Sequence, residues 1–413
     1  MPQGEEGAAS MALPGCGPLI LPEQGVERSL KDQVFDRIRA AGQIARVDLA
    51  RELSISPASI TTISADLIER GLVSEIDTPR DIARGRPPVA LTIRPEAGYV
   101  AGIKLSDHIH TAVLLDFAGN RLADASVASV AMVQGADQIE AAATAVLLAA
   151  LAESGLKPGD LKAIGLGLPG MIDAASGRVL WSPILKERGL DLAGRLAKAL
   201  NCPVYIDNDA NMVTLAELWF GAGRRLADFA VVTIEHGVGM GLVLNHRLYR
   251  GARGMGMELG HTKVQLDGAL CRCGQRGCLE AYVADYALVR EAATALNVAV
   301  PAGGHGMLED LFLQAKAGNA AARMIFERAS RYLAVGLANI VNLFDPELII
   351  LSGERMRYDF LYASEMIAEM SRLTLNAGRA PPRVEINAWG DMVWAQGAAA
   401  LALTHASAAA LAG

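Results

Sequence analysis

Four residues of the types that bind metal ions lie close together in the second half of the chain: His261, Cys271, Cys273 and Cys278. One imidazole and three thiolates form the donor set of a closed structural Zn2+ site. Because a closed shell leaves no position for a catalytic water, we expect the metal to brace a loop. The intervening glycines and polar residues favour the tight turns that such a loop needs. Three unligated cysteines beside a capping histidine are the alternative.

The residues around this cluster predict an α/β domain. From Gly98 onward, strand patterns alternate with helical patterns. Residues 99–105, 111–117 and 121–127 read as a three-stranded meander, and residues 136–153 as a helix. A further strand runs into the Gly-Leu-Pro-Gly turn at 167–170, and residues 204–206 lead into Asp-Asn-Asp-Ala-Asn at 207–211.

The N-terminal part predicts a different unit. Residues 29–41, 46–53 and 57–70 have the apolar periodicity of three helices. Ser56 can cap the third helix, Pro57 suits its first position, and Gly71 suits its end. The short turn between the second and third helices predicts a helix-turn-helix that reads DNA, and a plain three-helix bundle is the alternative. The expected DNA contacts on the third helix are Ser56, Ser59, Thr61, Thr62 and Ser64, whose short side chains can approach base edges and phosphates.

Two short strands, residues 72–76 and 89–93, are expected to pair as a wing after the third helix. The loop between them contains Arg84 and Arg86 in the stretch Arg-Gly-Arg-Pro-Pro. A narrow cationic segment of this kind suits a minor-groove probe. Because the two prolines favour extended backbone, a stiff interdomain hinge is a compatible alternative.

Composition limits the classes of protein to consider. The chain has 413 residues, of which 52% are hydrophobic and 20% charged, which allows two to three domains. A net charge of −7 argues against indiscriminate binding of nucleic acid by the whole chain. Residues 1–25 contain no Lys or Arg, so they predict a disordered tail and not a secretory signal. Five cysteines do not make a disulfide scaffold. We therefore expect a cytoplasmic protein without membrane segments.

Taken in order, these motifs resemble those of the ROK family, which comprises repressors, open reading frames and sugar kinases. The resemblance covers about residues 27–405. It is carried by the helix-turn-helix, Gly-Leu-Pro-Gly at 167–170, Asp-Asn-Asp-Ala-Asn at 207–211, Glu-Leu-Gly-His at 258–261, the Cys-x-Cys-x4-Cys cluster, and Asn339, Asp345-Pro346-Glu347 and Ser352-Gly353.

The resemblance implies a multidomain chain: a winged helix-turn-helix with linker (26–95) behind the tail (1–25), joined to an actin-like, ribonuclease-H-like duplicated α/β domain. Its N-terminal lobe would span residues 96–207, completed by about 390–413. Its C-terminal lobe would span residues 208–389 and carry the zinc knuckle.

The resemblance also implies a sugar site. A hexose needs carboxylates and amides at fixed positions around its hydroxyls. The implied sugar-binding residues are Gly170, Asn208, Asp209, Glu258, His261 and Glu280. Asp209 matches the general base of the family's kinases. Alternatively, Asn208 and Asp209 only cap the helix predicted at 210–220.

The phosphate loops of the kinases are not matched. Where the kinases have Asp-x-Gly-Gly-Thr, this chain has Lys104-Leu105-Ser106-Asp107-His108, and Glu235-His236 replace Gly-Thr in a second loop. Phosphate binding needs backbone N–H groups and an anion that holds Mg2+. We therefore expect no catalytic residue and no kinase activity. The predicted function is a homodimeric (or dimer-of-dimers) repressor of carbohydrate genes, with structural Zn2+, that binds a double-stranded DNA operator and responds to a sugar or sugar phosphate. An active sugar kinase with a fused DNA-binding domain and a protein-binding corepressor are the alternatives.

Overall fold

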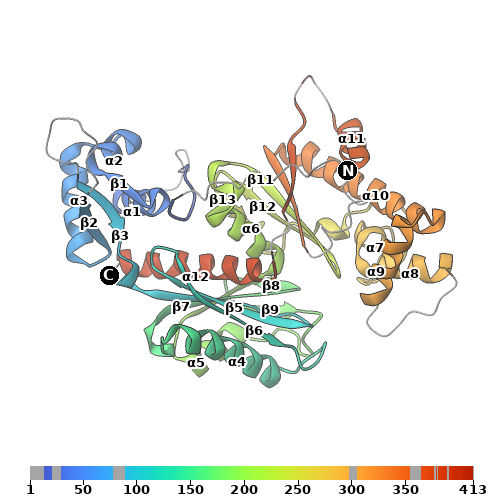
Figure 1. Ribbon diagram of the computed structural model, residues 1–413, viewed down its shortest axis with the longest axis horizontal. Coiled ribbons are helices and arrows are strands. Elements are labelled where there is room, and N and C mark those ends of the chain that lie inside the picture. The colour runs from blue at the N-terminus through green and yellow to red at the C-terminus, as the bar shows by residue number, and fades with distance from the viewer. Residues whose placement is uncertain are drawn as a thin grey trace.

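An N-terminal domain and two α/β lobes make up the computed structural model (Figure 1). It describes residues 14–20, 29–77, 89–296, 305–353, 364–375, 378, 380–387 and 390–412. Among these residues, no helix combines the length and the apolar character that crossing a bilayer requires.

The N-terminal domain packs three helices against a small antiparallel sheet. The helices are α1 (Leu30–Ala41), α2 (Arg46–Leu53) and α3 (Pro57–Glu69), and the strands are β1 (Gln43–Ala45), β2 (Val73–Asp77) and β3 (Val89–Ile93), in the order β1-β3-β2. Ser56 caps α3 by accepting a hydrogen bond from the Ser59 amide at 3.1 Å, with Pro57 at the first helical position. The three predicted helices and the two paired strands are confirmed. The strand β1 was not predicted, because three residues are too few to show a periodicity.

The two lobes repeat one topology. In the first lobe the strand order is β10-β7-β4-β5-β6, and in the second it is β13-β12-β11-β14-β15. In each sheet the first three strands in sequence are antiparallel neighbours, and the next two add in parallel on the other side. The same order and the same directions in both sheets confirm that the α/β domain is duplicated.

The first-lobe strands are β4 (Tyr99–Lys104), β5 (Ile109–Asp116), β6 (Arg121–Ala128), β7 (Leu161–Leu168) and β10 (Val204–Asn208). Those of the second lobe are β11 (Phe229–Ile234), β12 (Val238–Leu244), β13 (Arg247–Tyr249), β14 (Leu348–Ser352) and β15 (Arg383–Asn387). A small hairpin joins β8 (Met171–Asp173) to β9 (Arg178–Trp181). The other helices of the lobes are α4 (Ala136–Ser154), α5 (Leu192–Leu200), α7 (Glu280–Val283), α8 (Asp285–Leu296), α9 (His305–Lys316), α10 (Ala320–Phe344) and α11 (Ser364–Leu373).

Two helices occupy the space between the sheets. The last helix, α12 (Met392–Ala412), packs on the first-lobe sheet and on α6 (Asp209–Phe220), which also contacts β12 (Figure 1). Most residues of helix α12 are apolar and buried, as expected of a helix that packs between other elements. Its backbone comes so close to the sheet that a Cβ on Gly102 would lie 1.9 Å from the Ala395 carbonyl oxygen. Only glycine fits at that position.

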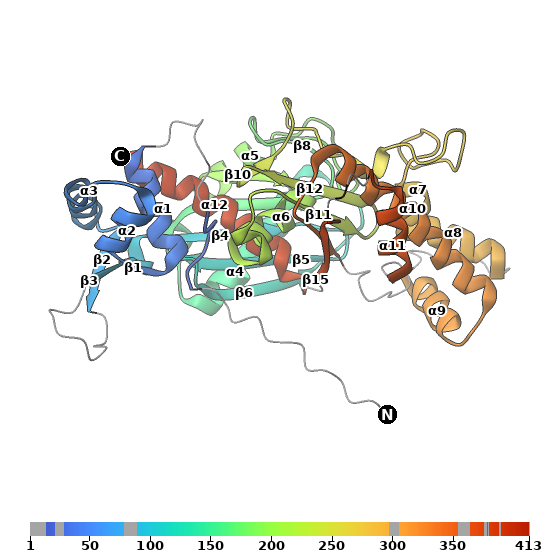
Figure 2. The ribbon, with the colours of Figure 1, turned by 90° about the horizontal axis from the view of Figure 1, so that it is seen from above.

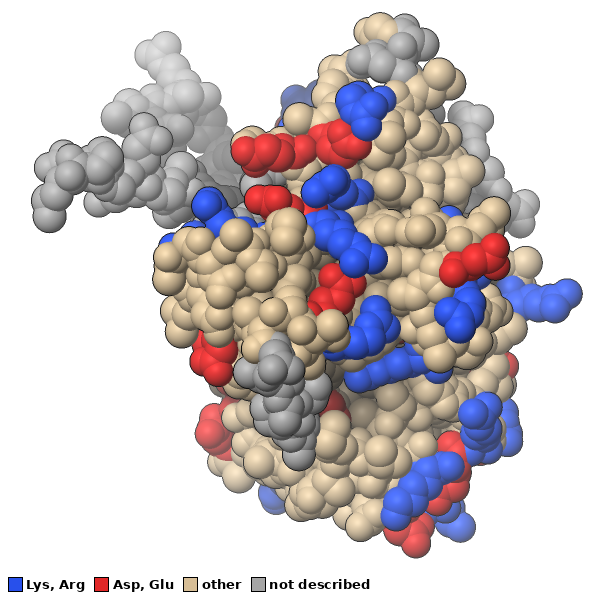
Figure 3. Space-filling view, turned by 90° about the vertical axis from the view of Figure 1, so that its right-hand side faces the viewer, with Lys and Arg blue, Asp and Glu red and all other residues tan. Residues whose placement is uncertain are grey.

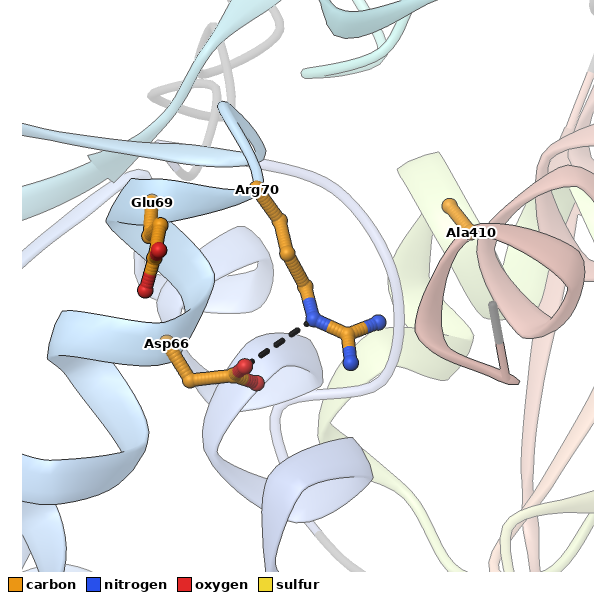
Figure 4. Close-up of a pocket in the computed structure, with 4 residues that line it drawn as sticks. All are labelled: Asp66, Glu69, Arg70 and Ala410. Carbon is orange, nitrogen blue, oxygen red and sulfur yellow. Dashed lines mark hydrogen bonds and ion pairs between the residues drawn. The ribbon is translucent and has the colours of Figure 1, made fainter.

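The far end of α12 reaches the N-terminal domain (Figure 2). Arg39 of α1 donates a hydrogen bond to the Ser407 hydroxyl, and Arg70 at the end of α3 donates to the Leu411 carbonyl at 3.4 Å. A crevice beside this contact is lined by Asp66, Glu69, Arg70 and Ala410 (Figure 4). A single helix therefore spans the first lobe and the N-terminal domain.

The expectation of a disordered tail over residues 1–25 is wrong for residues 14–20. The amide of Cys16 donates to the Arg39 carbonyl at 3.2 Å, and the amide of Gly17 donates to the Trp219 carbonyl at 2.8 Å. Arg224, itself buried, donates from Nε to the Gly17 carbonyl at 2.9 Å. These partners lie far away in sequence, so local composition cannot reveal them. Residues 1–13 and 21–25 lie outside the described residues.

Candidate functional site

The ends of two parallel strands bring the predicted site residues together. Strands β7 and β10 are in register, with Asn208 beside Leu168, so the turn after β7 meets the start of α6. The Asn208 side-chain amide donates to the Gly170 carbonyl at 2.8 Å, and its oxygen accepts from the Ala210 amide at 2.9 Å. Asn208 therefore caps α6 and joins the two loops, so the capping alternative describes part of its role.

Asp207 stabilises this loop through hydrogen bonds, a role that the sequence did not predict. Its buried carboxylate accepts hydrogen bonds from Asn211 Nδ2 at 2.8 Å and from Arg250 Nε at 2.6 Å. Arg250 follows β13 in the other lobe, so this ion pair crosses between the lobes. Sequence reasoning also missed Arg250, because no local pattern links it to a motif that precedes it by more than forty residues.

Four of the predicted groups influence one another electrostatically. Burial raises the pKa of Asp209, and the nearby positive charge of Lys104 partly offsets that rise. Burial also raises the pKa of Glu258; His261 lowers it, while Asp209 and Glu280 raise it further. Asp209 at the start of α6 and the second-lobe residues Glu258, His261 and Glu280 therefore lie close enough for their charges to interact.

Lys104 ends strand β4 in a buried position. Its ammonium nitrogen lies 3.6 Å from the centre of the Trp394 ring, close enough for a cation–π interaction. Trp394 belongs to the first turn of α12. The site of polar groups is therefore connected to α12 through Lys104.

The donor atoms of the cysteine cluster lie close enough together to hold one metal ion. The donor atoms of His261, Cys271, Cys273 and Cys278 all lie within 4.8 Å of one another. Cys271 Sγ is 3.7 Å from His261 Nδ1, and Cys273 Sγ is 3.7 Å from Cys278 Sγ. Zn–S bonds of about 2.3 Å in a tetrahedron place sulfur atoms about 3.8 Å apart, so the donors fit Zn2+. Lys263 donates to Cys278 Sγ at 2.9 Å and supplies positive charge beside the thiolates.

The same cluster abuts the polar site. His261 directs Nδ1 toward Cys271, which leaves Nε2 for a second partner. Glu280 begins α7 two residues after Cys278, and its Oε1 lies 3.6 Å from Cys271 Sγ. Tyr286 contacts both, donating to Glu280 Oε1 at 3.4 Å and to Cys271 Sγ at 3.5 Å. A metal in the cluster would therefore hold His261 and Glu280 in place.

On helix α3 the structure corrects one predicted contact. Ser56, Thr61 and Thr62 are exposed and Ser59 is half-buried, but Ser64 is buried and accepts a hydrogen bond from Arg46 Nε at 2.9 Å. Ser64 lies one helical turn after the buried Ile60, on the stripe that faces the domain core, so it cannot lie on an outward face. Arg84 and Arg86 lie outside the described residues.

The duplicated α/β domain is an architecture also found in solved structures of a sugar kinase and of a regulator. The ROK family model matches residues 100–405. The chain belongs to the ROK family, which confirms the resemblance seen in the motifs.

Relatives and solved structures agree with this assignment. The xylose repressor of Caldicellulosiruptor bescii is 26% identical over 377 residues, which cover 87% of this chain and 92% of the relative. The transcriptional repressor Mlc of Escherichia coli is 30% identical over 78% of this chain and 79% of the relative. A crystal structure of a ROK family transcriptional regulator, described as a homologue of E. coli Mlc, matches 93% of this chain and 98% of its own with a TM-score of 0.77 and 27% identity. A Streptomyces griseus ROK glucokinase in complex with glucose and AMPPNP matches 74% of this chain and 100% of its own, with a TM-score of 0.62 and 28% identity.

Proposed function

We propose that this protein is a sugar-responsive, DNA-binding transcriptional regulator, a repressor of carbohydrate-metabolism genes that acts in the cytoplasm. The observation that carries the proposal is the extent of the structural match. The transcriptional regulator aligns over 93% of the chain, whereas the glucokinase aligns over 74%, although the whole glucokinase is used. The family model begins at residue 100, so the α1–β3 domain is an addition to the kinase-like part.

In this proposal the N-terminal domain is a winged helix-turn-helix, with α3 in the major groove. The hydroxyls of Thr61 and Thr62 donate to carbonyls of their own helix, at 2.9 and 3.1 Å. Their methyl groups and acceptor lone pairs are left to meet bases and phosphates, together with Ser56 and Ser59. Arg84 and Arg86 would reach the adjacent minor groove. A dimer would read two half-sites.

The face at the opposite end of the molecule carries side chains of both charges (Figure 3). On the face that points away from the N-terminal domain, the described basic and acidic side chains are interspersed (Figure 3). Nucleic acid is attracted by a surface of one positive sign. The described side chains of that face therefore do not form the single-sign positive surface that would attract nucleic acid.

The effector is a sugar or sugar phosphate bound by Gly170, Asn208, Asp209, Glu258, His261 and Glu280. Ionised Asp209 would accept a strong hydrogen bond from a sugar hydroxyl. A structural Zn2+ held by His261, Cys271, Cys273 and Cys278 would fix His261 and Glu280 beside the sugar. The metal supplies no chemistry beyond this bracing.

Phosphoryl transfer does not fit the other half of the site. A kinase must bind Mg2+ and several phosphate oxygens there. In this chain Lys104 places a buried ammonium at the end of β4, and Asp107 and Glu235 bring carboxylates to the two loops. The cation disfavours Mg2+, and the carboxylates repel phosphate.

Coupling between sugar and DNA would run through α12. Its first turn holds Trp394 against Lys104, and its last turns contact Arg39 and Arg70 of the N-terminal domain. A change in the sugar site can therefore alter the position of the N-terminal domain. An effector acts in this way only if it binds the two arrangements with different affinity.

A screen of free and phosphorylated sugars tests the proposal. An effector raises the melting temperature, because it binds the folded state. It also changes the affinity of the purified protein for its operator, measured by fluorescence anisotropy. ATP-dependent phosphorylation of the sugar that shifts the melting temperature would identify the protein as a kinase with a fused DNA-binding domain. Operator binding by a protein that binds none of the sugars would favour the alternative of a protein-binding corepressor.

A further inference from the structure

Two loops of unrelated sequence meet where the lobes face each other. Asp107 and His108 lie between β4 and β5 of the first lobe. His236 lies between β11 and β12, the corresponding turn of the second lobe. Together they form the second group among the described residues whose donor atoms are close enough to hold one metal ion. None of the three belongs to the proposed sugar site or to the cysteine cluster.

The three donor atoms form a nearly equilateral triangle. His108 Nε2 lies 3.4 Å from His236 Nε2, and Asp107 Oδ2 lies 3.4 Å from His236 Nε2 and 3.5 Å from His108 Nε2. Nitrogen or oxygen ligands at about 2.0–2.1 Å from a tetrahedral metal ion lie about 3.4 Å apart. The triangle therefore has the dimensions of one face of a tetrahedral coordination shell.

A fourth residue orients one of the ligands. Asp285, largely buried at the start of α8, accepts from His236 Nδ1 at 3.0 Å. The Asp285 amide donates to the Glu235 carbonyl at 3.1 Å, which fixes this carboxylate to the loop that carries His236. A carboxylate on the outer nitrogen of a ligating histidine is the usual support of a metal site, because it fixes the tautomer.

The donor atoms of the triangle need a proton or a metal ion between them. When its Nδ1–H donates a hydrogen bond to Asp285, neutral His236 presents a lone pair at Nε2 toward the Asp107 carboxylate. Two electron-rich atoms at this distance repel unless a proton or a metal ion lies between them. An imidazolium at His236, held between Asp107 and Asp285, is therefore the alternative to a metal.

We propose that Asp107, His108 and His236 bind a divalent transition-metal ion that bridges the two lobes, with Asp285 as the positioning residue. Two imidazoles and one carboxylate suit Zn2+, Ni2+ or Fe2+, whereas Mg2+ prefers oxygen ligands. Because the ligands come from both lobes, the bound ion holds the lobes in the relative position seen here.

Metal analysis after equilibrium dialysis against Ni2+ tests the site in the full chain, with the cysteine cluster loaded with zinc. Wild-type protein is expected to bind one equivalent of Ni2+ while its zinc content stays unchanged. His108→Ala and His236→Ala are expected to lose this equivalent, and Asp285→Asn to weaken it about 10–100-fold. His405→Ala, on α12 and stacked on Tyr205 away from the triangle, is the control and should bind Ni2+ like the wild type. His108 is 43% exposed, so its replacement leaves the fold intact, which an unchanged zinc content verifies.

Thermal unfolding gives a second readout. Ni2+ is expected to raise the melting temperature of the wild type and of His405→Ala, but not that of His108→Ala. The proposal is overturned if the wild type binds no Ni2+ with its zinc in place. It is also overturned if the His108→Ala/His236→Ala double variant binds Ni2+ as tightly as the wild type. The first result would assign the contact to an imidazolium, and the second would place the Ni2+ elsewhere.

Discussion

Arg39 of the N-terminal domain and Ser407 of α12 form a buried hydrogen bond. The guanidinium also lies over the Phe35 ring, 4.6 Å from its centre, and 5.5 Å from the centre of the Trp219 ring. A cation is thus enclosed by aromatic rings at the junction of the two domains. Its contact with α12 gives the N-terminal domain a fixed position relative to the first lobe.

This contact predicts a selective loss of coupling. Ser407→Ala leaves a buried guanidinium N–H without its hydroxyl acceptor, which should cost about 1–3 kcal/mol of unfolding free energy. It should also reduce the change in operator affinity that the effector causes. Denaturant unfolding and fluorescence anisotropy measure the two effects. Thr404→Ala, on the exposed side of the same helix, is the control. If the effector changes the operator affinity of Ser407→Ala as much as that of the wild type, this contact does not take part in the coupling.

The metal cluster predicts one zinc ion per chain. Cys273→Ser is expected to lower the zinc content and also the sugar affinity, because His261 and Glu280 are attached to the same loop. Cys202→Ala removes a buried thiol of the first lobe and should keep the zinc. Metal analysis and calorimetry are the measurements. Full zinc occupancy in a Cys271→Ser/Cys273→Ser double variant would show that these cysteines are not ligands.

Asp209 distinguishes a sensor from an enzyme. Asp209→Asn keeps the shape of the side chain and removes its charge, so sugar binding should weaken by about 1.5–3 kcal/mol. Operator binding without sugar should stay near the wild-type level. The wild type should show no sugar-dependent turnover of ATP in a coupled assay. ATP turnover that Asp209→Asn abolishes would refute the regulator assignment.

The pH dependence of sugar binding follows from the same carboxyl. Because burial raises the pKa of Asp209, its charged form is lost, as pH falls, at a higher pH than for an ordinary aspartate. Sugar affinity should therefore decline on acidification through that raised pKa. Lys104 lowers the pKa of Asp209, so Lys104→Met should move the decline to higher pH.

Calorimetric titrations between pH 4.5 and 8 measure this shift. Glu258, whose pKa is also raised by burial, titrates in the same site. The effect of Lys104→Met on the pH dependence of sugar affinity is therefore measured both in the wild type and in the Asp209→Asn background. The difference between the two effects is the part due to Asp209. If the Lys104→Met shift persists in that background, another group carries the pH dependence.

On α3, neighbouring residues are predicted to behave differently. Replacing exposed Thr62 by Ala should change the sequence preference, whereas Ser64→Ala should leave the preference unchanged and destabilise the packing of α2 on α3. Replacing Arg84 and Arg86 together by Ala should lower the affinity for DNA. It should also reduce the preference for A·T base pairs in the flanks of the operator. Operator selection from a randomised pool measures the preference. Unchanged binding by the arginine variant would leave residues 84–88 as a hinge only.

Local sequence determined much of this protein. Helix boundaries follow from nearby residues such as Ser56 and Pro57, whose effects act within one turn. The metal donor set is also compact, since three ligands lie within eight residues and therefore stay close in any fold of the loop. The order of the motifs was sufficient to indicate the family, which the family model confirms over residues 100–405.

Only the tertiary structure decided the contacts between distant segments. The pairing of residues 14–20 with Arg39 and Trp219, and the ion pair of Asp207 with Arg250, join segments whose separation no periodicity encodes. Ser64 looked like its exposed hydroxyl neighbours, and its burial depends on where α2 crosses α3. Asp107 and His236 lie 3.4 Å apart only because the two duplicated lobes place their corresponding turns face to face. Such juxtapositions arise from the packing of whole sheets, which depends on the sum of many contacts and not on any one motif.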